Sequence, residues 1–174
     1  MEILPNEFYH VFNQGNNKQQ VFFNRENYLY FLEHAERHVK PHCELIAYCL
    51  MPNHFHFLIY TNEHSCEQLP LGSLQITQVK NGFRQLQSNY TKGINKNANR
   101  SGSLFRQNGK MKWVENNLFS VFDYIHQNPV DAGLANKAEN WEFSSFNDYR
   151  HNRKSICNME LGKKYMDLEY LKKM

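Results

Sequence analysis

Two histidines, His54 and His56, lie two residues apart in the segment Met51–Tyr60. If this segment is a strand, the alternation of side chains places both imidazoles on one face and Phe55 and Phe57 on the other. Neutral imidazole is a common metal ligand, so the pair could hold one divalent ion. A half-buried strand with two solvated histidines is the simpler alternative, because two ligands alone do not complete a site.

A tyrosine and an asparagine, Tyr124 and Asn128, could supply the missing groups. They fall in residues 117–128, whose apolar periodicity predicts a helix, and as i, i+4 neighbours they share its flank outside the apolar stripe. The Asn128 amide oxygen could be a third ligand and the Tyr124 phenol a nucleophile toward phosphorus. Such mixed ligation favours Mn²⁺ or Mg²⁺. Alternatively, Tyr124 is an ordinary surface residue and Asn128 caps the helix before Pro129.

Composition predicts a single globular domain over residues 1–150 and a polar, weakly helical tail over 151–174. The chain has 174 residues, of which 41% are hydrophobic and 14% aromatic, so it can bury a core. Its net charge of +3 excludes any claim of nucleic-acid binding from charge alone. Four cysteines without a CxxC pair, no signal peptide and no long apolar run favour a reduced, cytoplasmic protein.

The hydrophobic periodicity predicts the element order β-α-β-β-α-β-α. The first six elements match an α+β, ferredoxin-like βαββαβ fold, with an antiparallel sheet, helices on one face and an additional C-terminal helix carrying Tyr124. In this fold the other face of the histidine strand is expected to be open. Ser73 is expected to cap the second helix, and Asn108-Gly109 predicts a hairpin turn. The expected strands are 8–14, 43–50, 54–60 and 104–114, and the expected helices 24–39, 73–90 and 117–128.

These motifs resemble those of a known family. His54-Phe55-His56, preceded by Met51-Pro52-Asn53, is similar to the histidine-hydrophobic-histidine (HUH) motif, and the segment Tyr124–Leu134 resembles the tyrosine motif of the REP-associated tyrosine transposases. These proteins are related to the single-tyrosine transposases of bacterial insertion sequences. The resemblance covers roughly residues 8–149. It departs at Gln14 and Asp131, where family members commonly carry arginine.

The resemblance implies metal-dependent cleavage and rejoining of single-stranded, hairpin-bearing DNA. Tyr124 would be the catalytic nucleophile and would form a 5′-phosphotyrosine, while His54, His56 and Asn128 would hold Mg²⁺ or Mn²⁺. Relatives from insertion sequences form homodimers that exchange the tyrosine helix, so both a monomer and a homodimer remain open.

Basic residues among Gly, Asn and Ser suggest where DNA would bind. Six of them are expected to contact the DNA backbone, and two aromatic residues could stack on bases; the alternative is a solvated face with two core aromatics. The expected backbone contacts are Lys92, Lys96, Arg100, Arg106, Lys110 and Lys112, and the expected stacking residues are Phe105 and Trp113.

Two other functions are compatible with the same residues. A catalytically silent module would bind single-stranded nucleic acid on its aromatic-rich sheet, but would not need all four site residues. A metal-dependent phosphoesterase would activate water and would work without the Tyr124 hydroxyl. Neither His126, which the helical wheel turns away from Tyr124, nor scattered histidines such as His10 are assigned a role.

Overall fold

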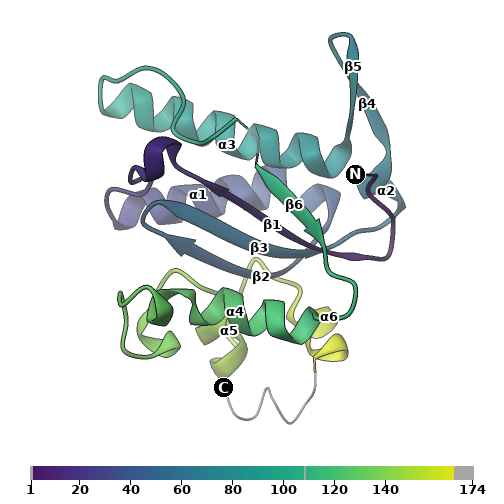
Figure 1. The fold of residues 1–174 in the computed structure, drawn as a ribbon, viewed down its shortest axis with the longest axis vertical. Helices are drawn as coiled ribbons and strands as arrows, with labels where there is room; N and C mark the ends of the chain where they lie inside the picture. The colour runs from purple at the N-terminus through teal and green to yellow at the C-terminus, as the bar shows by residue number, and fades with distance from the viewer. Residues whose placement is uncertain (1, 108, 167–174) are drawn as a thin grey trace.

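A computed structural model describes residues 2–107 and 109–166. Its main sheet is antiparallel and contains β1 (Phe8–Gln14), β2 (Glu44–Met51), β3 (His54–Tyr60) and β6 (Lys110–Trp113) in the order β2-β3-β1-β6. Helices α1 (Arg25–His38) and α3 (Gln78–Asn97) lie side by side on one face (Figure 1). This arrangement confirms the predicted ferredoxin-like fold.

Helix α1 illustrates how the sequence builds this layer. The Asn24 side chain accepts a hydrogen bond from the backbone N–H of Asn27 and caps the helix, as the sequence predicts. Tyr28, Phe31 and Ala35 then recur at helical spacing and are buried against the sheet. The Phe31 ring is fully buried, so it anchors the helix over the centre of the sheet.

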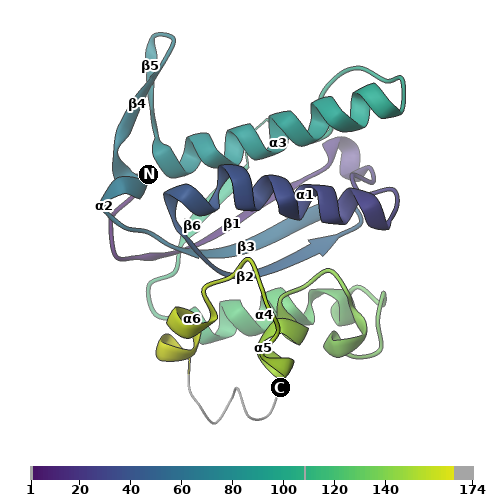
Figure 2. The ribbon, with the colours of Figure 1, turned by 180° about the vertical axis from the view of Figure 1, so that it is seen from behind.

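A two-stranded arm precedes α3. After the short helix α2 (Glu63–Cys66), β4 (Gln68–Leu71) and β5 (Leu74–Thr77) form a hairpin that projects from the domain (Figure 2). Gly72, at a φ of 61°, allows its tight turn. The expectation that Ser73 caps the helix is therefore wrong, because α3 begins only at Gln78.

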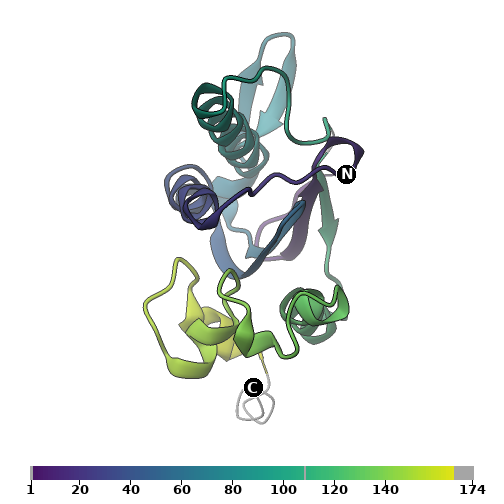
Figure 3. The same ribbon diagram turned by 90° about the vertical axis from the view of Figure 1, so that its left-hand side faces the viewer.

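The second face of the sheet is covered over β2 and β3, so the expectation that the histidine strand presents an open surface there was wrong. Helices α4 (Leu118–Asp131), α5 (Phe146–His151) and α6 (Met159–Tyr165) form a layer on the side opposite α1 and α3 (Figure 3). Phe122 of α4 belongs to a second core cluster with Ile46 of β2. Every residue of β2 after Glu44 is buried, which is typical of a strand covered on both faces.

Residues 105 and 110–113 lie along one edge of the sheet, next to β1. The hairpin expected at Asn108-Gly109 includes Asn108, which lies outside the described residues. The segments before and after it both pair with β1: Phe105 bridges Gly15, and Lys110 lies opposite Phe12. They do not form two strands of one hairpin. Instead, both segments lie along the same edge of β1. The other edge of β1 pairs with β3, the strand that carries His54 and His56.

Part of the C-terminal segment packs on the sheet. The backbone N–H of Asn158 donates to the Leu45 carbonyl oxygen at 2.7 Å, and the Asn158 side chain donates to Glu44 at 3.0 Å. Met166 is buried in the second core cluster. Residues 167–174 of the predicted tail lie outside the described residues. No described helix is both long and apolar enough to cross a membrane.

The fully buried His126 makes stability depend on pH. Its Nε2 lies 2.8 Å from the Ser145 hydroxyl oxygen, and burial lowers the His126 pKa to about 3. In the unfolded chain this pKa is about 6.5, so the unfolded state binds the extra proton first as pH falls. This contribution to stability is complete above pH ~6.5 and is lost as the pH falls toward the folded pKa.

We therefore expect the free energy of unfolding to fall by about 2 kcal/mol between pH 7 and pH 5 through His126 alone. Urea denaturation at both pH values measures the fall, and His126→Gln should make it smaller by about that amount. An equal fall in wild type and variant would contradict this assignment.

Candidate active site

The turn before β3 orients the first site histidine. His54 Nδ1 lies 2.6 Å from the side-chain oxygen of Asn53. An amide oxygen can only accept, so His54 carries its proton on Nδ1 and, when neutral, has a lone pair on Nε2. The Met51-Pro52-Asn53 segment thus sets the tautomer of the histidine that follows it.

The second site histidine, His56, is 4% exposed. Its Nδ1 lies 2.9 Å from Nε2 of His10, and the two rings stack with centroids 5.0 Å apart. His56 Nε2 is buried and has no hydrogen-bond partner among the described residues. When His56 donates its Nδ1 proton to His10, Nε2 presents a lone pair, which is the arrangement that a metal-ligating histidine adopts.

His10 is a site residue that the sequence reasoning missed. In the register of β1 and β3, Phe12 lies opposite His56 and His10 opposite Leu58, so His10 is a diagonal neighbour of His56 on the same face. The number of residues between His10 and the HUH motif does not indicate that they are in contact. Only the pairing of β1 with β3 brings His10 next to His56.

Helix α4 places Tyr124 beside these histidines. The Tyr124 ring is 47% exposed, and its centroid lies 5.6 Å from that of His56 and 6.0 Å from that of His10, edge-on to both. The phenol therefore packs against the histidine cluster while remaining open to a large substrate.

Asn128 connects the tyrosine to the histidines. Its Nδ2 donates to the Tyr124 carbonyl oxygen at 2.9 Å, and its side chain lies close enough to His54 to affect the pKa of that imidazole. Asn128 is buried rather than lying on an open flank, and α4 continues through Pro129 to Asp131 instead of ending before it. The structure thus brings His54, His56, Tyr124 and Asn128 together, and their roles as metal ligands and nucleophile stay predictions.

The histidines of the site are neutral near pH 7. Burial lowers the pKa of His56 to about 2, with smaller contributions from His10 and His54. Burial, and then the charge of Lys112, lowers the His10 pKa to about 4. Burial also lowers the His54 pKa, while the Asn128 side chain opposes that shift. Neutral imidazoles are the form that binds metals.

The donor set fits a divalent ion that also binds substrate oxygens. The free Nε2 of His56, the Nε2 lone pair of His54 and the amide oxygen of Asn128 supply nitrogen and oxygen ligands. No group of three or more His, Cys, Asp or Glu side chains among the described residues could hold a metal. An ion here would therefore depend on the Asn128 amide and on ligands from outside the chain.

The basic residues predicted to bind DNA fall into separate places. Lys110 and Lys112 are exposed on β6 opposite Phe12 and His10, so they share the face of Tyr124. Lys92 and Arg106 line a cavity between α3 and β6. The remaining two lie at the end of α3 and beyond it, Lys96 exposed and Arg100 donating to the Asn95 side chain.

The two aromatic residues predicted to stack on bases differ in exposure. Phe105 is 3% exposed and packs against Phe31 and Phe55, so its assignment as a stacking platform was wrong; it is a core residue. Trp113 is 44% exposed, donates to the Glu7 carboxylate and lies opposite Tyr9, on the α1/α3 side of β6. Its stacking role remains a prediction.

Comparisons with known proteins agree with the motifs. No family model matches the chain. A curated protein of Haemophilus influenzae strain Rd, described as a putative REP-associated tyrosine transposase, is 26% identical over 111 residues. The match covers 59% of this chain and 58% of the relative, so it spans little more than half the length of either protein.

A solved structure of a REP-associated tyrosine transposase bound to a REP hairpin has the same fold. It superimposes with a TM-score of 0.66 and 18% identity, covering 90% of this chain and 86% of that one. The sequence match thus agrees with the family that the two motifs indicate, and the structural match shows the fold.

Proposed function

Since the chain is a relative of the REP-associated tyrosine transposases in sequence and fold, we propose that it cuts and rejoins single-stranded DNA. The observation that carries the proposal is the position of Tyr124, half-exposed and edge-on to both His10 and the buried His56, which are hydrogen-bonded to each other. A tyrosine with no role other than as a surface residue would not need two neutral, hydrogen-bonded histidines in contact with its ring.

The reaction is a transesterification at phosphorus. The Tyr124 phenol oxygen attacks the scissile phosphate, a bond from that oxygen to phosphorus forms, and the bond from phosphorus to the 3′-oxygen breaks. The phenol loses its proton on attack, and the leaving 3′-oxygen gains one. The products are a 5′-phosphotyrosine and a free 3′-hydroxyl. Attack by a 3′-hydroxyl on this linkage reverses the step and joins strands without a nucleotide cofactor.

His54, His56 and Asn128 are the residues that would hold Mg²⁺ or Mn²⁺. When bound, such an ion withdraws electrons from a phosphate oxygen and stabilises negative charge that develops during displacement. The chain's own contribution is orientation. Asn53 sets the His54 tautomer, His10 sets that of His56, and the hydrogen bond from Asn128 to the Tyr124 carbonyl ties the amide to the turn that carries the nucleophile.

The proposed substrate is single-stranded DNA that carries a hairpin, as in the solved relative. Lys110 and Lys112 are exposed on the face of Tyr124, where they can contact phosphates next to the scissile one. The Lys112 ammonium lies 5.6 Å from the centre of the Phe12 ring, so it is held close to the site.

A denaturing gel tests the function. The protein is mixed with Mn²⁺ and a labelled pool of hairpin DNAs with single-stranded flanks. We expect a band shifted by covalently attached protein that requires Mn²⁺. Cleavage without an adduct would instead establish a phosphoesterase that activates water, and binding of the pool without cleavage would establish a silent binding module.

The contact between His10 and His56 predicts an effect on metal affinity. Replacing His10 with Phe removes the acceptor for His56 Nδ1, so we expect Mn²⁺ affinity to fall about 10- to 100-fold. His10→Gln should retain more affinity, because its side-chain oxygen can still accept that hydrogen bond. The electron paramagnetic resonance signal of free Mn²⁺ measures binding without turnover. Wild-type affinity in His10→Phe would rule out this role.

A further inference from the structure

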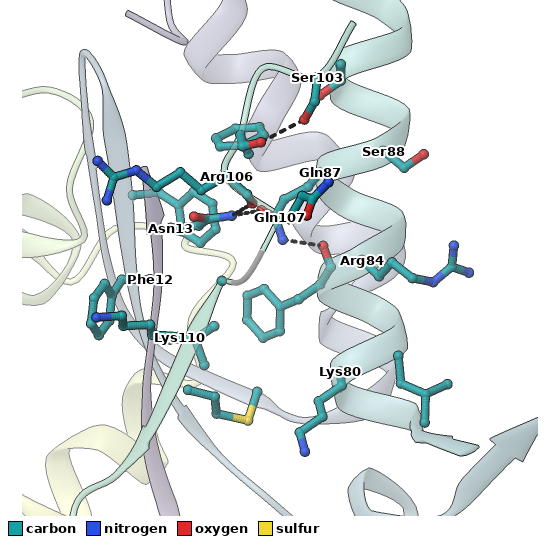
Figure 4. A pocket seen from close by; sticks show the side chains of 18 of the residues that line it. Phe12, Asn13, Lys80, Arg84, Gln87, Ser88, Ser103, Arg106, Gln107 and Lys110 are labelled. Atoms are coloured by element: carbon teal, nitrogen blue, oxygen red, sulfur yellow. Dashed lines mark hydrogen bonds between the residues drawn. The ribbon is translucent and has the colours of Figure 1, made fainter. Parts of the chain in front are cut away.

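The cavity that Lys92 and Arg106 line lies at the edge of the sheet next to β6. It has a volume of about 750 Å³ and lies between α3 and β6 (Figure 4). Val11 and Asn13 line it from the α1/α3 face of β1, and Phe12, whose ring packs beside His56 on the opposite face, lines it as well. The cavity therefore lies at the sheet edge next to the candidate active site, and Phe12 contributes to both.

The lining combines apolar side chains, here called the floor, with basic side chains, here called the rim; Figure 4 shows Lys80 extending toward β6, whereas Arg84 extends away from it. Phe83 and Met111 are among the apolar residues of the floor, and none of the described residues that line the cavity is Asp or Glu. Five lining residues are basic: Lys80, Arg84, Lys92, Arg106 and Lys110. In a chain with 20 basic and 17 acidic residues, this segregation favours a ligand with an apolar part and negative charge around it. A nucleotide has this combination, since its base is flat and its phosphates are anionic.

Basic residues also connect this cavity with the active site. Lys110 lines the cavity, yet it lies opposite Phe12, and Figure 4 shows its side chain beside the Phe12 ring. Lys112 follows two residues later on the same face, opposite His10. Since β6 is the last strand at this edge of the described sheet, a DNA strand can cross the edge here without displacing another strand.

We propose that this cavity holds one unpaired nucleotide of the DNA substrate, with its base on the floor and its flanking phosphates on the rim. The strand then continues over β6, past Lys110 and Lys112, to Tyr124. This proposal rests on the proposed function and adds a second contact point, which would fix how far the scissile phosphate lies from an unpaired base.

Binding measurements without metal test the cavity independently of cleavage. The probe is a fluorescein-labelled hairpin with single-stranded thymidine flanks, and fluorescence anisotropy is recorded in EDTA. Met111→Trp fills the floor and should weaken binding about tenfold, whereas the volume-conserving Met111→Leu should stay within about twofold. Lys80, which extends from α3 toward β6 in Figure 4, tests the rim: Lys80→Glu should weaken binding about tenfold. Its control, Lys154→Glu, changes an exposed lysine outside the cavity by the same charge.

An abasic scan locates the base. Each flank thymidine is replaced in turn by an abasic residue. We expect one position at which wild type loses about fivefold or more in affinity, and at which Met111→Trp loses nothing further. Circular dichroism checks that Met111→Trp is folded. If it is not, the affinity of Lys80→Glu and the abasic scan on wild type decide whether the cavity binds a nucleotide.

Uniform affinity across the scan, or wild-type binding by both Met111→Trp and Lys80→Glu, would overturn the cavity proposal. The proposed function fails by a different result. A protein that shows the expected abasic position but never forms a covalent adduct keeps the nucleotide site and loses the tyrosine chemistry.

Discussion

Tyr124→Phe should abolish the covalent adduct, with a loss of about 10³-fold or more in the rate of strand cleavage, because it removes the attacking oxygen. The ring would remain, and with it the edge-on contacts with His10 and His56. DNA affinity measured by anisotropy should therefore stay within about twofold of wild type. The cleavage rate is measured on the hairpin DNA selected from the pool.

Tyr60→Phe is the matched control for this variant. Tyr60 lies at the other end of β3, where its hydroxyl donates to the Asn6 side-chain oxygen at 3.4 Å and also hydrogen-bonds Tyr165. It should cleave DNA at the wild-type rate. If Tyr124→Phe cleaved as fast as Tyr60→Phe, the nucleophile would be water or another residue, and the tyrosine mechanism would be wrong.

The second large effect is expected for His56→Ala, which removes a neutral nitrogen ligand and the partner of His10. Mn²⁺ affinity should fall about 100-fold or more, and adduct formation should fall with it. Isothermal titration with Mn²⁺ and the denaturing gel measure the two quantities. The loss of the buried ring also leaves a void, so circular dichroism and thermal melting must show that the variant is folded at the assay temperature.

His151→Ala serves as the control, because His151 is an exposed histidine on α5 outside the site. It should bind Mn²⁺ and form the adduct as wild type does. If folded His56→Ala bound Mn²⁺ with unchanged affinity, His56 would not be a metal ligand.

The sequence could predict those parts of the site that are local in the chain. His54 and His56 share a face because a strand alternates, and Tyr124 and Asn128 are neighbours because a helix turns every 3.6 residues. His10 could not be found in this way. Its contact with His56 depends on the register of β1 against β3, which no spacing within either strand reports.

The errors in the fold have similar physical causes. The open face was inferred from a general two-layer topology, although the unbroken apolar run Leu45–Met51 already indicated a strand buried on both sides. Phe105 was interpreted from its basic neighbours, whereas its burial is decided by packing with Phe31, Phe55 and Tyr90, which are distant in sequence. In both cases contacts between distant segments outweighed local composition.

The end of the cut DNA strand that becomes attached to the protein decides whether Tyr124 is the nucleophile. The hairpin DNA is labelled at its 5′ end in one sample and at its 3′ end in another, and each is incubated with protein and Mn²⁺. A 5′-phosphotyrosine predicts that only the 3′-labelled fragment shifts with the protein, and that mass spectrometry finds the adduct on the peptide containing Tyr124. The 5′-labelled fragment should be released with an extendable 3′-hydroxyl. A shift of the 5′-labelled fragment, or an adduct on another residue, would contradict the mechanism.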